Sequence, residues 1–182
     1  MHSTLLTLSA LASTAFSLAI PDGASTDSGA PRDGAPFSLV AVSTNGVNFP
    51  STPVIAHDGS LFVGASKTPT DHRVYLWTGS QATQGLYVDP SGFGAGVTFY
   101  ATDSSDLPRN AQREKFSIDG QTRELTFQGI GGKACPTGKD GEWMVSFSEL
   151  EKPEGTDGCV EVDLMAYSQT DDTFCEYSPK PE

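Results

Sequence analysis

Several kinds of chemistry are excluded by residues that this 182-residue chain lacks or has in small number. Lys and Arg number 11 against 23 Asp and Glu, a formal net charge of −12, and the basic residues are scattered. The chain therefore lacks the clustered cations that binding to nucleic-acid phosphates requires, and we expect no nucleic-acid partner. The chain has three His, no Gly-x-Ser-x-Gly elbow, no Cys-x-x-Cys pair and no Asp-x-Asp-x-Asp-Gly run. We accordingly predict no catalytic, cofactor-binding or metal site, and no enzymatic activity.

Helical periodicity is also absent, whereas turn residues are abundant. The chain contains 19 Gly and 12 Pro, and no segment repeats its apolar residues every 3.6 positions. Short runs with a period of two recur instead, and in the clearest of them Val160, Val162 and Leu164 alternate with the acids Glu161 and Asp163. Turn-forming residues bound these runs and predict a turn at His57 to Ser60 and hairpins at Asn45-Gly46 and Asp119-Gly120. These runs predict strands near 37–42, 47–49, 61–63, 74–77, 86–88, 97–100, 116–118, 125–127, 143–147 and 160–164. The prediction is a single all-β domain, an antiparallel β-barrel or β-sandwich with many short strands.

The first 36 residues differ in composition from the rest. Residues 1–19 carry no Lys, Arg, Asp or Glu and end in Ser17-Leu18-Ala19, which predicts a signal peptide cleaved after Ala19. Residues 20–36 are rich in Ser, Gly, Pro and Asp and predict a flexible spacer. We place the β domain at 37–178 and a tail at 179–182. Because no other segment could span a bilayer, we expect a secreted protein without a membrane partner.

Negative charge is concentrated near the C-terminus. Ten acidic and two basic residues lie between Glu149 and Glu182, so this fifth of the chain carries −8 of the net −12. One interpretation is a set of solvated loops that keep a secreted protein soluble. The alternative is a surface for a divalent cation or a polycation.

Three cysteines, Cys135, Cys159 and Cys175, lie in the last third of the chain. A secreted protein meets an oxidising compartment, so at least one disulfide is expected. Three thiols permit one intramolecular bridge and leave one cysteine over.

Two further sequence patterns bear on ligand binding. The stretch Gly92-Phe93-Gly94-Ala95-Gly96 superficially resembles a phosphate loop, but a predicted strand follows it and no Lys accompanies it, which favours a turn or bulge. Tyr75 and Trp77 share one face of a predicted strand and are candidates for stacking on sugar rings. Burial in the core is the competing interpretation of these two aromatic residues.

A series of short motifs, in order, resembles one protein family. The motifs are Leu86 to Gly96 (LYVDPSGFGAG), Pro108 to Arg113 (PRNAQR), Phe116 to Asp119, Ala134-Cys135-Pro136, Gly141-Glu142-Trp143, Asp157-Gly158-Cys159 and Cys175-Glu176-Tyr177. They are similar to the PhiA family of fungal cell wall proteins. The resemblance implies a secreted protein of the cell wall, connected with phialide and conidium development, and related to secreted proteins that bind IgE. It carries no catalytic residues.

The resemblance also bears on the cysteines. Relatives have an additional cysteine shortly before the strand that corresponds to Val74, where this chain has Ala65 to Thr70. If that cysteine pairs with the equivalent of Cys175 in relatives, the bridge left in this chain is Cys135 to Cys159, with Cys175 free or an alternative partner.

The functional hypothesis from the sequence is a non-enzymatic structural or adhesive protein of the cell wall, whose partner is a wall polysaccharide. The alternatives are a secreted effector or elicitor resembling an allergen, and a carbohydrate-active enzyme. The sequence does not indicate an oligomeric state.

Overall fold

A computed structural model describes residues 29–31, 37–44, 51–64, 85–92, 95–101 and 109–168. Within these ranges the chain forms strands joined by turns, and one short 3-10 helix. The elements are β1 (Phe37–Ser43), β2 (Thr52–His57), β3 (Ser60–Gly64), β4 (Gly85–Asp89), β5 (Val97–Ala101), β6 (Phe116–Ile118), β7 (Leu125–Phe127), β8 (Gly132–Pro136), β9 (Glu142–Ser146), η2 (Pro153–Gly155) and β10 (Val160–Ser168). The predicted all-β class is confirmed.

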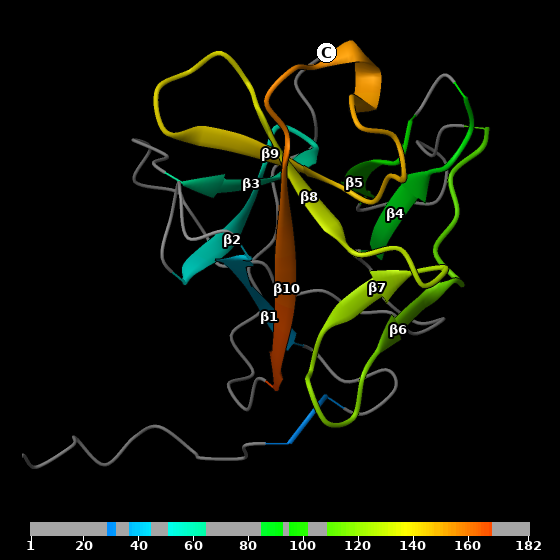
Figure 1. Cartoon of the computed structure of the whole chain (residues 1–182). Helices are drawn as coiled ribbons and strands as arrows, with labels where there is room; N and C mark the ends of the chain where they lie inside the picture. Colours follow the sequence, from blue (N-terminus) through cyan, green and yellow to red (C-terminus); the bar gives the residue numbers. More distant parts are fainter. Residues whose placement is uncertain are drawn as a thin grey trace, which may run out of the picture.

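The main sheet closes on itself to form a barrel (Figure 1). Its strands follow the order β2-β1-β10-β8-β9-β3, and β3 pairs back with β2. Strand β5 enters the ring between β9 and β3, through the pairs Val97 with Ser146 and Ser60 with Phe99. Seven antiparallel strands thus enclose the interior, and β4 extends the sheet from β5. Of the two predicted architectures, the barrel is the one observed.

Strand β10 is the longest and joins two parts of the barrel. It pairs with β1 over seven residues, from Phe37 with Ser168 to Ser43 with Val162, and its start pairs with β8. Val162, Leu164 and Ala166 are buried, whereas the residues between them face outward. The predicted alternation of buried and solvated residues along this strand is therefore correct.

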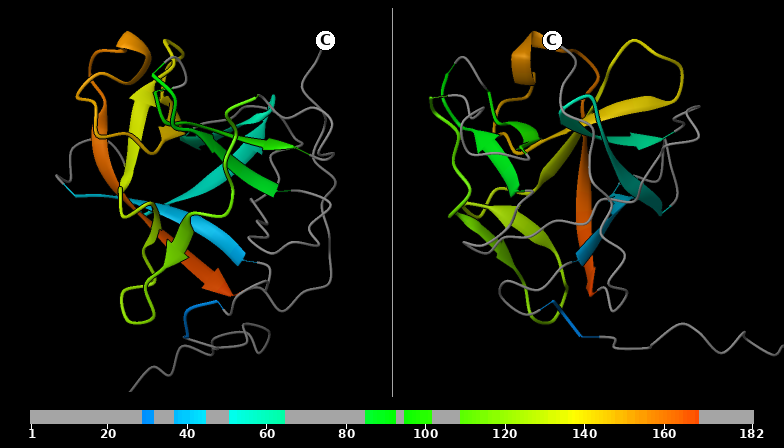
Figure 2. Two further views of the ribbon diagram at one scale, coloured as in Figure 1. Left: turned by 90° about the vertical axis from the view of Figure 1, so that its right-hand side faces the viewer. Right: turned by 180° about the vertical axis from the view of Figure 1, so that it is seen from behind.

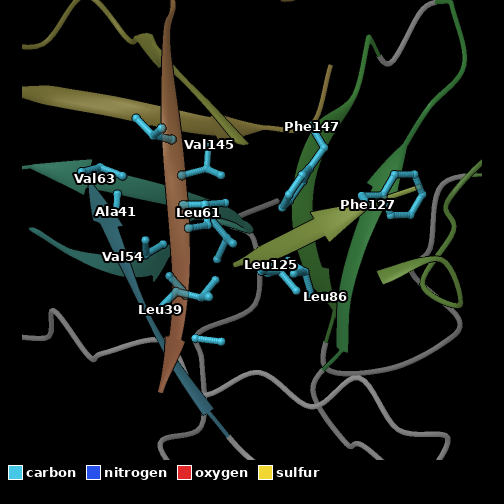
Figure 3. Packing of buried hydrophobic residues seen from close by; sticks show 14 of the residues in the cluster. Leu39, Ala41, Val54, Leu61, Val63, Leu86, Leu125, Phe127, Val145 and Phe147 are labelled. Carbon is cyan, nitrogen blue, oxygen red and sulfur yellow. The ribbon is translucent and has the colours of Figure 1, made fainter. Parts of the chain in front are cut away.

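Apolar side chains of moderate size fill the barrel interior (Figure 3). Leu39, Val54, Leu61, Val63 and Val145 point into the space between the strands and are almost fully buried. A barrel of this size leaves room for side chains only, so its core is packed and not a channel.

A second part of the core lies under the β6–β7 hairpin, which stands beside the barrel (Figures 1 and 2). The ring centroid of Phe116 lies 5.0 Å from that of Phe127 and 5.5 Å from that of Phe147, and both pairs are edge-to-face. The amide of Ala166 on β10 donates to the carbonyl of Arg123, which fastens the hairpin to the barrel. Three aromatic rings, from β6, from β7 and from the residue after β9, thus pack the hairpin against the barrel.

The turn of this hairpin is organised by one exposed carboxylate. Oδ1 of Asp119 accepts hydrogen bonds from the backbone amides of Gln121 and Thr122, at 2.8 and 2.6 Å. Because these bonds favour the ionised form, they hold the pKa of Asp119 below its usual value. The Asp119-Gly120 turn predicted from the sequence is therefore present as a carboxylate-capped turn.

Two strands, β2 and β8, lack the sequence signal by which the others were predicted. The segment Thr52–His57 contains Pro53, and Gly132–Pro136 contains glycine, lysine and proline, so neither has a clear apolar alternation. Both are strands because neighbouring strands pair with them on each side. The hairpin predicted at Asn45-Gly46 and the strand predicted at 74–77 lie outside the described residues.

No helical element in the described ranges has the length and apolar character needed to cross a membrane.

Two glycines permit close contact between strands. Gly64 ends β3 with a φ of +106°, and a Cβ there would overlap the carbonyl of Gly141. Gly96 precedes β5 with a φ of +83°, and a Cβ there would overlap the carbonyl of Phe147, whose amide donates to Gly96 at 2.8 Å. Only glycine combines this backbone conformation with this approach.

The disulfide bond joins Cys135 on β8 to Cys159, the residue before β10. The two cysteines are 24 residues apart, and the enclosed loop contains β9 and η2. The bridge therefore ties two strands of the barrel at the point where the chain returns from η2.

We predict that Gly96→Ala destabilises the protein by roughly 3 kcal/mol or more, because it adds both backbone strain and overlap with a carbonyl. Gly120→Ala is the matched control, since Gly120 has open space around it. Urea unfolding followed by tryptophan fluorescence would measure both changes. Equal stabilities of the two variants would show that the close approach at Gly96 is not required.

We also predict that replacing Cys135 and Cys159 together by alanine lowers the free energy of unfolding by about 3 kcal/mol, since the loop is no longer closed in the unfolded chain. Cys175→Ala should leave the stability unchanged. Mass spectrometry of peptides from the unreduced protein would identify the bonded pair. A peptide that contains Cys175 linked to either other cysteine would contradict this assignment.

Candidate functional site

One acidic side chain of the barrel, Glu142 at the start of β9, is buried, with 7% of the residue exposed. The hydroxyl of Thr137 donates to its Oε1 at 3.0 Å, and the ammonium of Lys139 lies 3.2 Å from the same oxygen. Nε2 of His57 lies 3.7 Å from Oε2, a distance that suits an ion pair but not a hydrogen bond. The carboxylate thus has two partners, Thr137 and Lys139, and a longer contact with His57 that is an ion pair only when the imidazole carries a second proton.

These contacts hold the loop between β8 and β9. The backbone amide of Thr137 donates to the carbonyl of Glu142, and the amide of Glu142 donates to the carbonyl of Lys139, each at 3.2 Å. Lys139 is largely exposed, so its ion pair adds little. The Thr137 hydroxyl also lies 3.3 Å from the carbonyl oxygen of Glu142, so loss of the carboxylate would remove the shorter of its two hydrogen bonds. This arrangement is a structural contact between a strand and its preceding loop.

His57 is held on the barrel wall by further contacts. Its ring stacks on Phe62 with centroids 3.9 Å apart, and its Nδ1 lies 3.3 Å from Oδ2 of Asp58. In the same β2–β3 turn, the amide of Gly59 donates to the hydroxyl oxygen of Tyr100 at 3.3 Å. Burial raises the pKa of Tyr100, and the nearby negative charge of Asp58 adds to the increase.

A groove of about 550 Å³ lies over the outward-facing side of β10. We call it the acidic groove, because its polar lining includes Glu124, Lys133, Ser148, Glu149, Glu161 and Asp163. Glu161 and Asp163 alternate with buried residues of β10 and therefore project from the same face of the strand. Lys133 lies opposite Glu161 on β8, and its ammonium donates to the carbonyl of Leu150. Four carboxylates and one ammonium thus surround one depression.

The acidic groove explains part of the uneven charge of the sequence. Three of its carboxylates, Glu149, Glu161 and Asp163, belong to the acidic C-terminal segment, whereas Glu124 comes from the β6–β7 hairpin. In the described part of the chain, no group of three or more His, Cys, Asp or Glu side chains has an arrangement that could hold a metal ion.

A smaller depression of about 390 Å³ lies beside the turn between β4 and β5. We call it the polar pocket, and its lining residues are Pro90, Ser91, Arg109, Asn110, Ala111 and Gln112. Val88 and Gln112 exchange two backbone hydrogen bonds of 2.9 Å, which join the two sides of the pocket. The pocket therefore combines two motifs, Leu86 to Gly96 and Pro108 to Arg113, that are separate in the sequence.

Only some of the site residues predicted from the sequence lie within the described ranges. Cys135 and Cys159 are bonded to each other. Cys175, Tyr75 and Trp77 lie outside the described residues, so the glycan-stacking role of the two aromatic residues stays a prediction.

Sequence reasoning did not identify the acidic groove or the polar pocket as depressions. The clustered acids between Glu149 and Glu182 were a partial signal for the groove. The pocket had no signal of its own, because Arg109 and Ser91 are 18 positions apart and meet only through the Val88–Gln112 bridge.

We predict that Glu142→Ala lowers the free energy of unfolding by roughly 1–2 kcal/mol, since it removes the buried carboxylate that accepts the shorter hydrogen bond of Thr137 and pairs with Lys139. Glu142→Gln should cost less, because it keeps the shape and an acceptor for Thr137. Glu151→Ala, at an exposed position, is the control. Denaturant unfolding at neutral pH would measure all three, and an equal effect of Glu142→Ala and Glu151→Ala would contradict the structural role of Glu142.

Comparison with known proteins identifies relatives of this chain. The family model of PhiA-like secreted proteins matches residues 37–178. A cell wall protein phiA of Aspergillus fumigatus is 31% identical over 159 residues, which cover 78% of this chain and 84% of that protein. A cell wall protein phiA of Aspergillus niger is 30% identical over 160 residues, covering 79% and 85%.

A third relative, cell wall protein phiA of Emericella nidulans, is 36% identical over 110 residues, or 59% of each chain. No solved structure matches the chain significantly. The names of these relatives describe cell wall proteins and no enzymatic activity. Because the family model covers most of the chain and two relatives match along most of their own length, this chain belongs to the family of PhiA-like secreted proteins, whose named relatives are cell wall proteins.

Proposed function

We propose that this protein is a non-catalytic component of the fungal cell wall that adheres to wall polysaccharide through the acidic groove. The observation that carries the proposal is family membership: the PhiA-like match extends over residues 37–178, which include every strand described above. Non-covalent retention in a wall requires a surface that binds a wall polymer. A structural contribution at the hyphal or conidial surface is the biological role that we propose.

The acidic groove supports this role by its shape and its chemistry. Its carboxylates accept hydrogen bonds from sugar hydroxyls, while Ser148 and Lys133 supply donors. Glu161, Asp163 and Lys133 stand on paired strands, so the groove is organised before a ligand binds and less entropy is lost on binding.

The charge of the groove ranks the candidate polymers. Four carboxylates against one ammonium attract amino sugars more strongly than neutral sugars, because ammonium groups form charge-assisted hydrogen bonds with carboxylates. We therefore expect the highest affinity for partly deacetylated chitin, above that for the neutral polymers chitin, β-glucan and mannan. Binding to the deacetylated polymer should weaken as salt rises.

A carbohydrate-active enzyme is the second candidate, and one observation favours it. Glu161 and Asp163 share one face of β10 at alternate positions, which separates their Cα atoms by about 6.6 Å. Glycosidases use carboxyl groups roughly 5 to 9.5 Å apart, a separation that side chains on Cα atoms at this spacing can reach. Release of reducing sugar from any of the four polymers, lost in Glu161→Gln, would favour this candidate over the non-catalytic role.

The adhesive role is tested by sedimentation of the purified secreted protein with each insoluble polymer. We expect binding to at least one polymer, and about a tenfold loss of affinity in the double variant Glu161→Gln/Asp163→Asn, since each lost charge-assisted bond weakens binding. The double variant Glu151→Gln/Glu154→Gln removes the same charge outside the groove and should bind as the wild type does.

Absence of binding to all four polymers would overturn the adhesive role. Equal losses in the two double variants would overturn the assignment to the acidic groove and indicate an effect of net charge alone.

A further inference from the structure

The polar pocket differs in charge from most of this acidic protein. None of its six lining residues is acidic, although the chain carries 23 Asp and Glu. Arg109 contributes a guanidinium, and Ser91, Asn110 and Gln112 contribute neutral polar groups. Within the described part of the chain, Arg109 takes part in none of the observed ion pairs. The pocket thus contains a cation that forms no ion pair with a carboxylate of the described residues.

The residues that follow Arg109 carry a local excess of positive charge, whereas two acids, Asp103 and Asp106, precede it. Residues 109–115 contain Arg109, Arg113 and Lys115 against the single acid Glu114, a balance of +2 in a chain of net charge −12. The facing turn from Asp89 to Gly92 contains one carboxylate, that of Asp89, whose Oδ1 accepts a hydrogen bond from the backbone amide of Ser91 at 2.9 Å. Asp89 is therefore engaged in its own turn.

Hydrogen bonds hold both walls of the pocket in place. The amide of Ala95 donates to the carbonyl of Ser91 at 2.8 Å, and the amide of Gly96 donates to the carbonyl of Asp89 at 2.9 Å. On the opposite wall, Nε2 of Gln128 donates to Oε1 of Gln112 at 3.1 Å. Because these walls are already ordered, little entropy is lost when a small ligand binds.

The pocket also changes the interpretation of the glycine-rich stretch from Gly92 to Gly96. The sequence indicated a turn, partly because no lysine accompanies it as in a phosphate loop. The structure places Arg109, from a distant segment, at the pocket formed by the start of that turn. The cation beside this turn therefore comes from a segment that tertiary folding brings close, and not from the glycine-rich stretch itself.

We propose that the polar pocket binds a sugar that carries an oxyanion, a carboxylate or a phosphate, with Arg109 contacting the anionic group. A guanidinium matches the two oxygens of such a group with two parallel hydrogen bonds. Asn110 and Gln112 then face the sugar hydroxyls with amide groups. The volume of about 390 Å³ is near the lower end of the range of roughly 300–1,000 Å³ typical of small-molecule sites, as suits a short saccharide.

This site is separate from the acidic groove and takes a ligand of opposite charge. If the polar pocket binds no sugar, the proposed adhesion through the acidic groove is unaffected. If the acidic groove binds no polymer, the proposal for the polar pocket is likewise unaffected. Polymer sedimentation tests the first proposal and titration with small sugars tests the second, so the two results are distinguishable.

The experiment is a titration of the ¹⁵N-labelled secreted protein with three probes, followed by NMR. The probes are methyl glucuronide for the carboxylate source, mannose 6-phosphate for the phosphate source, and methyl glucoside as the neutral sugar. We expect one or both anionic sugars to shift the amide signals of Ser91, Asn110 and Gln112. The affinity of the protein for an anionic sugar that binds should exceed its affinity for methyl glucoside at least about fivefold, since charge-assisted hydrogen bonds are stronger than neutral ones.

Variants assign the effect to Arg109. Arg109→Gln should weaken binding of the anionic sugar about tenfold, and Arg109→Lys should have an intermediate effect, because lysine keeps the charge and loses the fork. Lys152→Gln removes a cation that pairs with Asp157 outside the pocket, and should change the affinity less than about twofold. The amide spectrum of each variant reports whether it is folded. If Arg109→Gln does not fold, Arg109→Lys alone tests the role of the guanidinium.

Response to only one anionic probe supports the site and names the source of its oxyanion. The proposal is overturned if the glucoside binds as well as both anionic sugars, if the shifted signals lie away from the pocket, or if the Arg109 variants bind as tightly as Lys152→Gln does.

Discussion

The pairing of β10 with β1 and β8 is the constraint on which the rest of the structure depends. This pairing joins the N-terminal strand of the described fold to the strands that carry the disulfide. A strand has a period of two, so the same register that buries Val162, Leu164 and Ala166 turns Glu161 and Asp163 outward. A slip of one residue would place carboxylates in the core and valines in the groove. Barrel closure and the acidic groove are therefore two consequences of one register.

Closure also requires backbones to approach closely at particular points. Gly64 and Gly96 lie where β3 meets the β8–β9 loop and where β5 meets the end of β9. Near the first of these points, Glu142 is buried with Thr137, Lys139 and His57 around it. A buried carboxylate in a protein of net charge −12 is stabilised only because these partners are present. Glu142 and the residues around it are thus part of the barrel wall, whereas the acidic groove and the polar pocket are lined by other residues.

The two depressions divide the surface by charge. The acidic groove gathers carboxylates from β10, the β6–β7 hairpin and the segment after β9, while the polar pocket holds an arginine and no acid. If each binds as proposed, one protein contacts amino sugars on one surface and anionic sugars on another. A small rigid barrel with two such surfaces would link polymers of different charge, which suits a structural component of a wall.

The sequence by itself determined the all-β class, most strand positions, the family and the excess of negative charge. These properties follow from local patterns: alternation at Val160, Val162 and Leu164, turns at Asp58-Gly59 and Asp119-Gly120, and motifs in a fixed order. Strands β2 and β8 could not be predicted, because Pro53 and Gly132 disrupt the local pattern and only pairing with neighbouring strands makes these segments extended. The choice of a barrel over a sandwich, the burial of Glu142 and the meeting of Ser91 with Arg109 were decided only by the tertiary structure. Each of these depends on contacts between residues far apart in the chain, and the free energy of such contacts is not encoded in any single segment.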